Sequence, residues 1–170
     1  QSGAAVIETH EKAYFDSIAS RTKGHWDFET AGDNEGWIST FMNLATWEGA
    51  LSAVSNSTHK DPTLNLSSKA NLKAMNYVAL EIRCRYKYDA DKVHPMVLYF
   101  TTDRETKMDE AKTLRVHLKS TDSKGEWETY RIDITKVETW RNTIMDLRLD
   151  PFNAVGSMDI DYIRFIEGEN

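Results

Sequence analysis

Apolar and polar side chains alternate most regularly in the stretch YVALEIRCRYKY, residues 77–88. One face carries Val78, Leu80, Ile82, Cys84, Tyr86 and Tyr88, and the other carries Ala79, Glu81, Arg83, Arg85 and Lys87. A period of two is typical of a β-strand with one buried face. The stretch therefore predicts a strand whose apolar face contributes to a core.

Seven further stretches have strand-like length and composition, and turn-forming clusters such as TAGDNEG, DADKVHP and STDSKGE separate them. They lie at about 36–41, 49–55, 96–102, 113–119, 128–134, 143–149 and 158–166. Many short strands with almost no helix between them are typical of an all-β sandwich or jelly roll. The sequence therefore predicts a β-sandwich jelly roll.

The segments outside these strands complete the predicted organisation. Residues 5–20 have loose helical spacing, which predicts a short N-terminal helix or an extended lead-in. The polar stretch TDRETKMDEAK between two strands, at 102–112, predicts a long surface loop. We therefore expect a lead-in or linker at 1–22 and one β-sandwich domain at 23–170.

The last predicted strand, within SMDIDYIRFIEG at 157–168, mixes carboxylates with apolar side chains. Its apolar set is Ile160, Tyr162, Ile163 and Phe165. Asp159 and Asp161 stand among them, and burying a carboxylate is costly unless it is paired, hydrogen-bonded or bound to a metal. The strand therefore predicts a metal ion, a basic side chain such as Arg164 or Arg148, or solvent beside these two carboxylates.

Composition and charge narrow the class of protein. A chain of 170 residues is long enough to bury one core without disulfides. Its formal net charge of -6 and pI of about 5.4 argue against a general nucleic-acid binder, because neutralising phosphates takes a basic surface. Cys84 is the single cysteine, which excludes an intrachain disulfide and every multi-cysteine zinc motif. We therefore expect a monomer that does not bind nucleic acid.

The sequence contains no motif that assigns a reaction. No run approaches the roughly 20 apolar residues of a membrane helix, so no membrane span is predicted. The five histidines lack metal-ligand spacing, and neither a glycine-rich phosphate loop nor a nucleophile elbow occurs. We therefore predict a binding protein rather than an enzyme, with no catalytic residue assigned.

A set of short motifs follows one another along the chain. They are WDFE at 26–29, EGW at 35–37, DP at 61–62, the strand from Tyr77, WETYRIDIT from Trp127, Trp140, LRLDP at 147–151, Gly156 and IDYIRF at 160–165. Their order resembles that of the galactose-binding-like β-jelly-roll carbohydrate-binding modules, over about residues 25–167. The resemblance implies a non-catalytic domain that binds a polysaccharide or oligosaccharide. It also implies an extracellular or cell-surface location and attachment to other domains of a larger chain.

The resemblance also implies a structural calcium ion between the first and last strands. The positions that match the acidic ligands are Glu29 of WDFE and Asp161 of IDYI. Calcium takes six to eight oxygen ligands in irregular geometry, so backbone carbonyls complete such a cage. Asp27, Asp33 or Asp159 can replace either candidate, and the sequence does not choose among them.

Sugar rings present flat C–H faces, so exposed aromatic side chains serve as platforms for them and polar side chains supply directed hydrogen bonds. Trp47 follows a polar turn, and Tyr99 lies on the face of its strand opposite Met96, Leu98 and Phe100; both are predicted platforms. Among the remaining tryptophans, Trp26 and Trp37 are assigned to core packing. Trp127 and Trp140 are assigned to packing or to a lid.

The outward positions of several strands are basic. They are Arg83, Arg85, Lys87, Arg115, His117, Lys119, Arg131 and Arg148. If their strands neighbour one another in one sheet, they form a basic platform beside Tyr99 that suits an acidic polysaccharide. Alternatively they are solvated strand residues with Glu81, Glu128 and Asp133 as partners. The predicted carbohydrate-binding set is Trp47, Tyr99, Arg83, Arg85, Arg115 and His117.

Two other classes of function stay open. An adhesion or protein-interaction domain can use the same sandwich, since fold does not determine function. A small jelly-roll polysaccharide lyase needs a base and a residue that neutralises a carboxylate, for which Tyr99, His117, Arg83 and Arg115 are available. The signature segments of such lyases do not occur in the chain.

Overall fold

The computed structural model describes residues 24–168, which form a sandwich of two antiparallel sheets. The elements are β1 (His25–Trp26), β2 (Trp37–Thr40), β3 (Met42–Trp47), β4 (Ala50–Ser55), β5 (Thr63–Leu66), β6 (Leu72–Lys73), the 3₁₀ helix η1 (Ala74–Asn76), β7 (Tyr77–Asp89), β8 (Pro95–Thr102), β9 (Thr113–His117), β10 (Glu128–Asp133), β11 (Thr143–Asp150) and β12 (Val155–Glu167). No helix in this range is long and apolar enough to cross a membrane. The expected lead-in at 1–22 lies outside the described residues.

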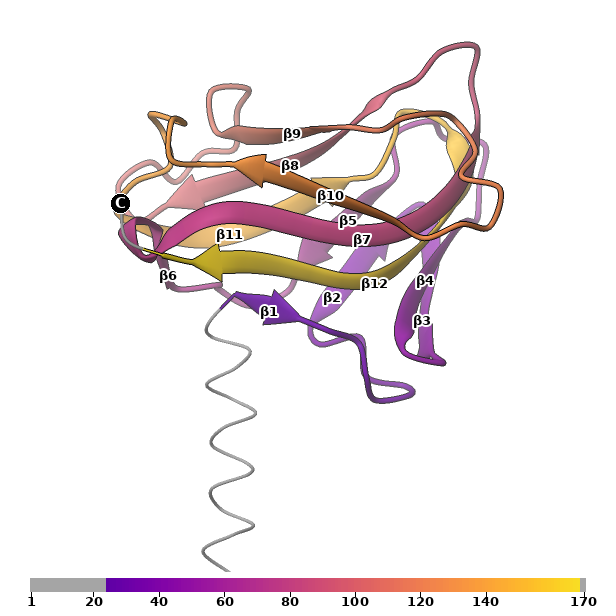
Figure 1. Ribbon diagram of the computed structural model, residues 1–170, viewed down its shortest axis with the longest axis horizontal. Coiled ribbons are helices and arrows are strands. Elements are labelled where there is room, and N and C mark those ends of the chain that lie inside the picture. Colours follow the sequence, from indigo (N-terminus) through magenta and orange to yellow (C-terminus); the bar gives the residue numbers. More distant parts are fainter. Residues whose placement is uncertain (1–23, 169–170) are drawn as a thin grey trace, which may run out of the picture.

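Each sheet contains six strands, and consecutive strands often lie in different sheets. Sheet A has the order β10-β7-β12-β4-β3, with β1 paired to β12. Sheet B has the order β2-β5-β11-β8-β9, with β6 paired to β11. In Figure 1, β10, β7 and β12 lie in front of β11 and β5. This arrangement is the predicted β-sandwich jelly roll.

The eight predicted strands are all present, and four short strands were missed. β1, β5 and β6 have only two to four residues each, too few for a period to be visible. β3 follows β2 directly, because Phe41 has φ of 65° and breaks the extended chain without a typical turn sequence. The prediction therefore placed no strand between 41 and 49, although β3 is an edge strand of sheet A.

The inner faces of the two sheets form one core. The alternation predicted for 77–88 is confirmed from Leu80 onward, but Tyr77 and Ala79 are buried and Val78 is only half-buried. The alternation of buried and exposed positions is interrupted at this end of β7, where its pairing with β12 shifts register between Ile166 and Glu167. Burial raises the pKa of the Cys84 thiol to about 12, so the thiol stays protonated and unreactive.

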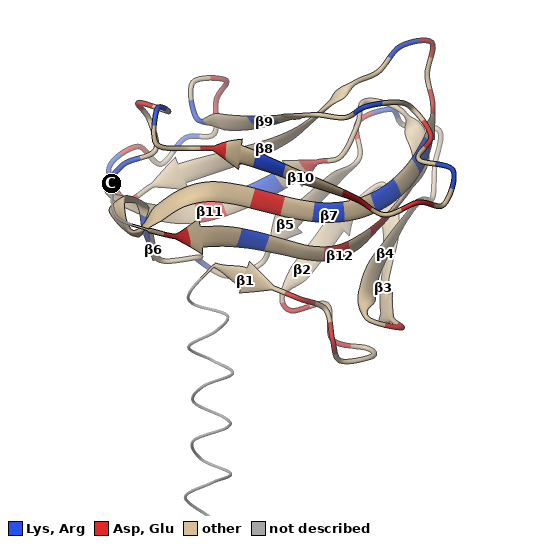
Figure 2. Cartoon of the chain, viewed as in Figure 1, with Lys and Arg blue, Asp and Glu red and all other residues tan. Residues whose placement is uncertain are grey.

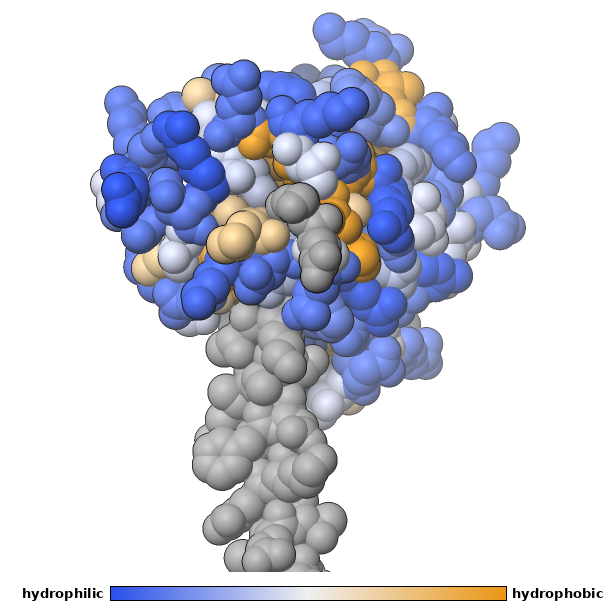
Figure 3. Space-filling model, turned by 60° about the vertical axis from the view of Figure 1, so that its left-hand side comes forward, coloured by the Kyte–Doolittle hydropathy of each residue, from blue (hydrophilic) through white to orange (hydrophobic). Residues whose placement is uncertain are grey.

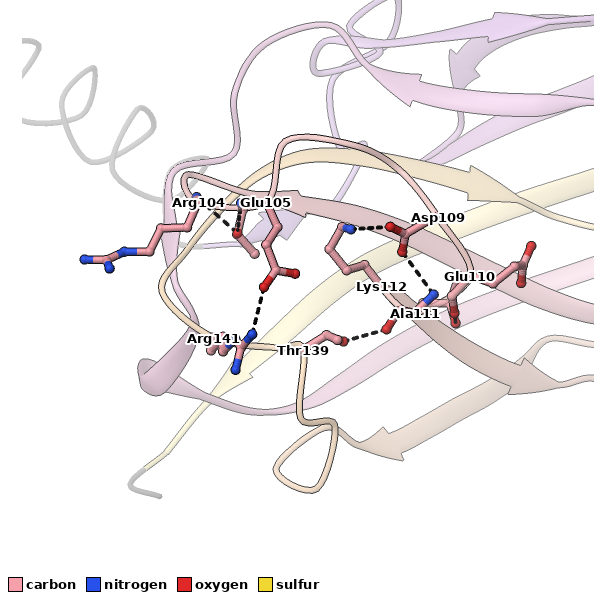
Figure 4. Close-up of polar contacts among 10 residues, drawn as sticks. Arg104, Glu105, Asp109, Glu110, Ala111, Lys112, Thr139 and Arg141 are labelled. Atoms are coloured by element: carbon pink, nitrogen blue, oxygen red, sulfur yellow. Dashed lines mark hydrogen bonds and ion pairs between the residues drawn. The ribbon is translucent and has the colours of Figure 1, made fainter.

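The predicted loop between β8 and β9 is confirmed, and it packs against the end of sheet B. Thr139 donates a hydrogen bond to the Ala111 carbonyl, and Arg141 is ion-paired with Glu105 at 2.7 Å (Figure 4). The Lys112 side chain is buried and its ammonium contacts Asp109 at 2.8 Å. Thr101, near the end of β8 where this loop begins, is buried, and its hydroxyl donates a hydrogen bond to Asp146.

Gly156 allows β12 to approach β7 closely. A Cβ atom at this position would lie 2.4 Å from the Lys87 carbonyl oxygen and 2.5 Å from the Tyr88 Cα atom. We expect Gly156→Ala to lower the free energy of unfolding by about 1–3 kcal/mol, because the clash is with backbone. Thermal denaturation measures the loss, and Ser157→Ala is the matched control on the same strand. Equal melting temperatures for both variants would contradict the prediction.

Candidate functional site

The solvent-facing side of sheet A, called outer face A below, carries polar side chains in rows across the strands. One row follows the pairing register of four strands, with Ala45 opposite Ser52, Ser52 opposite Asp159, and Asp159 opposite Arg85. Each of these side chains stands on the face opposite the core, because its strand neighbours are buried or, in the case of Leu44, half-buried against the core. The row therefore brings polar groups from β4, β12 and β7 together.

Two tryptophans border this row on outer face A, one near each edge strand of sheet A. Trp47, at the end of β3, is 54% exposed. Trp127, directly before β10, is half-buried, and the guanidinium carbons of Arg83 and Arg85 lie 5.0 and 4.5 Å from its ring centroid. A hollow of about 190 Å³ lies between them, lined also by Ser52, Arg85 and Asp159. Aromatic, donor and acceptor groups thus line one opening on outer face A.

The carboxylates of β12 are paired with the arginines of β7. Arg85 Nε lies 2.8 Å from Asp159 Oδ2, and Arg83 lies 2.6 Å from Asp161 Oδ2. A β-bulge between Ile160 and Tyr162 accompanies the second pair. The carboxylates are partly exposed and ion-paired, so their place among apolar residues needs no metal. Their partners are Arg85 and Arg83, and not the expected Arg164 or Arg148.

Polar contacts continue toward the other end of β12. Tyr162, predicted as a core residue, lies on outer face A and donates a hydrogen bond of 2.6 Å to Glu81. Burial and this hydrogen bond raise the pKa of the Tyr162 hydroxyl. Glu81 also accepts from Arg131, and Arg164 pairs with Asp27 at 2.7 Å. Figure 2 shows the resulting mixture of basic and acidic positions on β7, β10 and β12.

A buried cluster fixes the segment that carries Trp127. Glu128 accepts hydrogen bonds from the Tyr86 and Tyr130 hydroxyls, which are also 2.8 Å from each other. Burial and the hydrogen bond to Glu128 raise the pKa of Tyr130. Ser123 bonds to both backbone groups of Tyr86. Since these contacts join residues 120–130 to β7, Trp127 is held against the two arginines.

The predicted binding set does not form one surface. Trp47, Arg83 and Arg85 belong to sheet A, whereas Tyr99 lies on β8 in sheet B. Arg115 and His117 lie on β9, also in sheet B. The proposed basic platform beside Tyr99 is therefore wrong as a single face. The lyase candidates are divided as well, because Arg83 is in the other sheet from Tyr99, His117 and Arg115.

Two sheet B members of the set, Tyr99 and Arg115, contact the same carboxylate, Glu110. Tyr99 donates to Glu110 at 2.8 Å, and Arg115 pairs with the same carboxylate at 2.7 Å. Arg148 stacks on the Tyr99 ring at 4.3 Å and bonds to Asp150 through two nitrogens. Carbohydrate binding by Tyr99, Arg115 and His117 stays a prediction. Nothing brings these residues to the Trp47 hollow.

Sequence reasoning missed Trp127 and Asp159 as lining residues of the hollow. Trp26, Trp37 and Trp140 are buried, as expected. Trp127 was assigned to packing or a lid. Because Tyr130 faces the core, odd positions from 127 face outward, and this alternation was the available signal. The same phase argument, applied to β12, places Asp159 on the outer face.

The calcium assignment stays a prediction of the resemblance. Glu29 lies exposed in the loop after β1, and the Asp161 carboxylate contacts a guanidinium. Among residues 24–168 no three His, Cys, Asp or Glu side chains are grouped so that they could hold a metal ion. A guanidinium 2.6 Å from Asp161 repels a divalent cation, so this donor pair fits calcium poorly.

Comparison with solved structures finds this jelly roll in carbohydrate-binding modules. A family 11 module from Clostridium thermocellum, in complex with a β-1,3-1,4-mixed-linked tetrasaccharide, matches with a TM-score of 0.54 and 12% identity, covering 86% of this chain and 98% of that one. The CBM22-1 xylan-binding domain of Xyn10C from Paenibacillus barcinonensis has a TM-score of 0.50 and 15% identity, covering 85% and 94%. An agarase, AgWH50C, matches with a TM-score of 0.62 and 7% identity over 86% of this chain and 25% of that one.

No known protein-family profile matches this chain, and no curated protein does. At such low identities the structural likeness establishes the fold. The chain has the β-jelly-roll fold of carbohydrate-binding modules.

Proposed function

We propose that this protein is a non-catalytic carbohydrate-binding module and that outer face A binds a polysaccharide chain. The observation that carries the proposal is the exposed Trp47 beside a row of paired Arg85 and Asp159 across an open sheet face. An indole stacks on the C–H face of a pyranose ring. The guanidinium and carboxylate supply donors and acceptors in fixed directions for its hydroxyls. The hollow thus combines both kinds of contact that a sugar ring needs.

The charge pattern favours a polysaccharide whose main chain is neutral. Arg83 and Arg85 are each compensated by a carboxylate at hydrogen-bond distance. An acidic main chain would have to compete with Asp161 and Asp159 for these guanidinium groups. A neutral ring needs only the donors and acceptors that the ion pairs leave free, so we propose a neutral glycan as the principal ligand.

We further propose that the module is extracellular and acts within a larger chain. The fold occurs as part of larger proteins, since the match spans 25% of the agarase chain. A module that holds an attached domain near a polysaccharide raises the effective concentration of that domain there. This role requires binding and no bond cleavage by the chain itself.

A protein-interaction role has less support on the described surface. Such a role uses a wide apolar patch. The exposed large apolar side chains, Ile38, Trp47, Val54, Met75 and Val93, lie on different elements. Figure 3 shows one side of the molecule, on which hydrophilic side chains dominate and apolar areas are small.

Affinity electrophoresis tests the proposed function. We expect the protein to be retarded by at least one gel containing mixed-linked β-glucan, xylan, mannan, agarose or pectin, because outer face A offers an aromatic platform in an open hollow. An unrelated protein of similar charge serves as the control for sieving. Unchanged mobility of the folded protein in every gel would overturn the proposal.

A further inference from the structure

A second hollow lies next to the first on outer face A. It has a volume of about 470 Å³ and is lined by Val54, Val155, Ser157 and Lys87, among others. Ser157 is opposite both Val54 and Lys87 in the ladder, so this row neighbours the row of Asp159. Adjacent outward rows are two residues apart, about 7 Å along the strands. A polysaccharide bound beside Trp47 therefore reaches the second hollow within one or two sugar rings.

The walls of the second hollow suit a sugar as well. Val54 is 47% exposed and offers an apolar surface to C–H groups. Gly156 also lines the hollow, and the β7 backbone at Lys87 and Tyr88 fills the position that its Cβ atom would take. This part of the wall is therefore formed by closely packed backbone.

Lys87 differs from the other basic residues on the strands of outer face A, because its positive charge is not part of an ion pair in 24–168. The four arginines on the strands of sheet A are each ion-paired: Arg83 with Asp161, Arg85 with Asp159, Arg131 with Glu81 and Arg164 with Asp27. Lys87 is exposed and makes no ion pair with any residue in 24–168. Asp122 lies opposite it in a β-bridge, and the Asp122 carboxylate accepts a hydrogen bond from the Lys124 amide. Asp89, one outward row further along β7, also lines the hollow. The Lys87 ammonium group is thus a cation without an ion-pair partner in 24–168, beside the bound chain.

We propose that the second hollow is a specificity subsite in which Lys87 binds a carboxylate-bearing side group of the polysaccharide. This inference rests on the proposed function, since it takes the main chain to lie on outer face A. The ammonium donates hydrogen bonds and attracts a carboxylate, whereas the paired arginines serve the neutral rings. Asp89 repels the same carboxylate and confines it to the Lys87 side of the hollow. The subsite therefore selects a neutral main chain that is decorated with uronic acid.

The test compares polymers that share a main chain and differ in carboxylates. The probes are xylan substituted with glucuronic acid and the same xylan after enzymatic removal of that acid, and carboxymethyl cellulose against hydroxyethyl cellulose. Titration followed by tryptophan fluorescence gives the affinity ratio within each pair. We expect the wild-type protein to prefer the carboxylated member about fivefold at low salt, and less at high salt.

Three variants assign the preference to the subsite. Lys87→Gln is expected to abolish the preference while it keeps affinity for the neutral member. Asp89→Asn is expected to increase the preference, because it removes the repelling carboxylate. Lys73→Gln, which removes the same charge from β6 in sheet B, is expected to change nothing.

The outcomes separate this inference from the proposed function. Equal wild-type affinity for both members of a pair, or a preference that survives Lys87→Gln, overturns the Lys87 subsite and leaves polysaccharide binding intact. A folded wild-type protein that binds none of the four polymers and none of the electrophoresis gels overturns both.

Discussion

Replacing Trp47 by alanine is expected to weaken polysaccharide binding by about 2 kcal/mol, roughly a 30-fold rise in Kd. Trp47 is the most exposed aromatic platform on outer face A, at 54%. The turn that follows it, Glu48 and Gly49, has positive φ at both positions, which is typical of a tight β-hairpin. Because this turn fixes the end of β3 without contacts from the indole, we expect Trp47→Ala to reduce binding affinity and to leave the fold intact.

The stability of the Trp47→Ala variant separates binding from folding. An exposed side chain contributes little to the core, so we expect the free energy of unfolding to change by no more than about 0.5 kcal/mol. Isothermal titration with the retained polysaccharide and thermal denaturation measure the two quantities. Ile38→Ala is the matched control, because Ile38 is 56% exposed and lies on β2 in sheet B.

Two outcomes would contradict the Trp47 prediction. Affinity that survives Trp47→Ala would remove Trp47 from the site. Affinity that survives Trp47→Ala and is lost in Tyr99→Ala would move the ligand to sheet B, where Tyr99 stacks under Arg148.

Replacing Phe165 by alanine is expected to lower the free energy of unfolding by about 3–5 kcal/mol. Phe165 is fully buried, and its ring centroid lies 5.0 Å from that of Trp140, 6.1 Å from Tyr77 and 6.3 Å from Trp26. These rings come from β12, the β10–β11 connection, β7 and β1. The substitution leaves a cavity where these four parts of the chain meet.

Chemical denaturation measures the loss of unfolding free energy in Phe165→Ala. In thermal denaturation, we expect the melting temperature to fall by on the order of 10 °C. Ile166→Ala, at the half-buried neighbouring position, is the control and is expected to cost far less. If Phe165→Ala does not fold, Phe165→Leu provides the measurement, with a smaller loss because less volume is removed. A loss for Phe165→Ala no larger than that of Ile166→Ala would show that the aromatic cluster is not central to stability.

The strands could be predicted from the sequence because their signal is local. The alternation along β7 predicted that alternate residues from Leu80 to Tyr88 face the core and that Arg83, Arg85 and Lys87 face the surface, and the structure agrees. The burial of Trp26, Trp37 and Trp140 was predicted as well. A period of two shows which face of a strand is apolar, and it needs no knowledge of neighbouring strands.

Strand adjacency could not be predicted, and it decided the site. The sequence contains strand signals for β8 and β9 as well as for β7, yet those two strands lie in sheet B, which separates Tyr99 and Arg115 from Arg83. The bulge at Asp161 and Tyr162 likewise depends on pairing with β7 and moves Tyr162 out of the core. These errors share one cause, because periodicity within a strand contains no information about its partners.

The sequence by itself determined an all-β sandwich, its approximate strands and the exposed position of Trp47, because local periodicity and turn chemistry suffice for these. Tertiary structure alone decided which charges meet. Arg85 and Asp159 are 74 residues apart, and Arg83 and Asp161 are 78 apart. Each pair forms because β7 and β12 are neighbours in sheet A, and the same pairing places Ser157, which has no carboxylate, opposite Lys87.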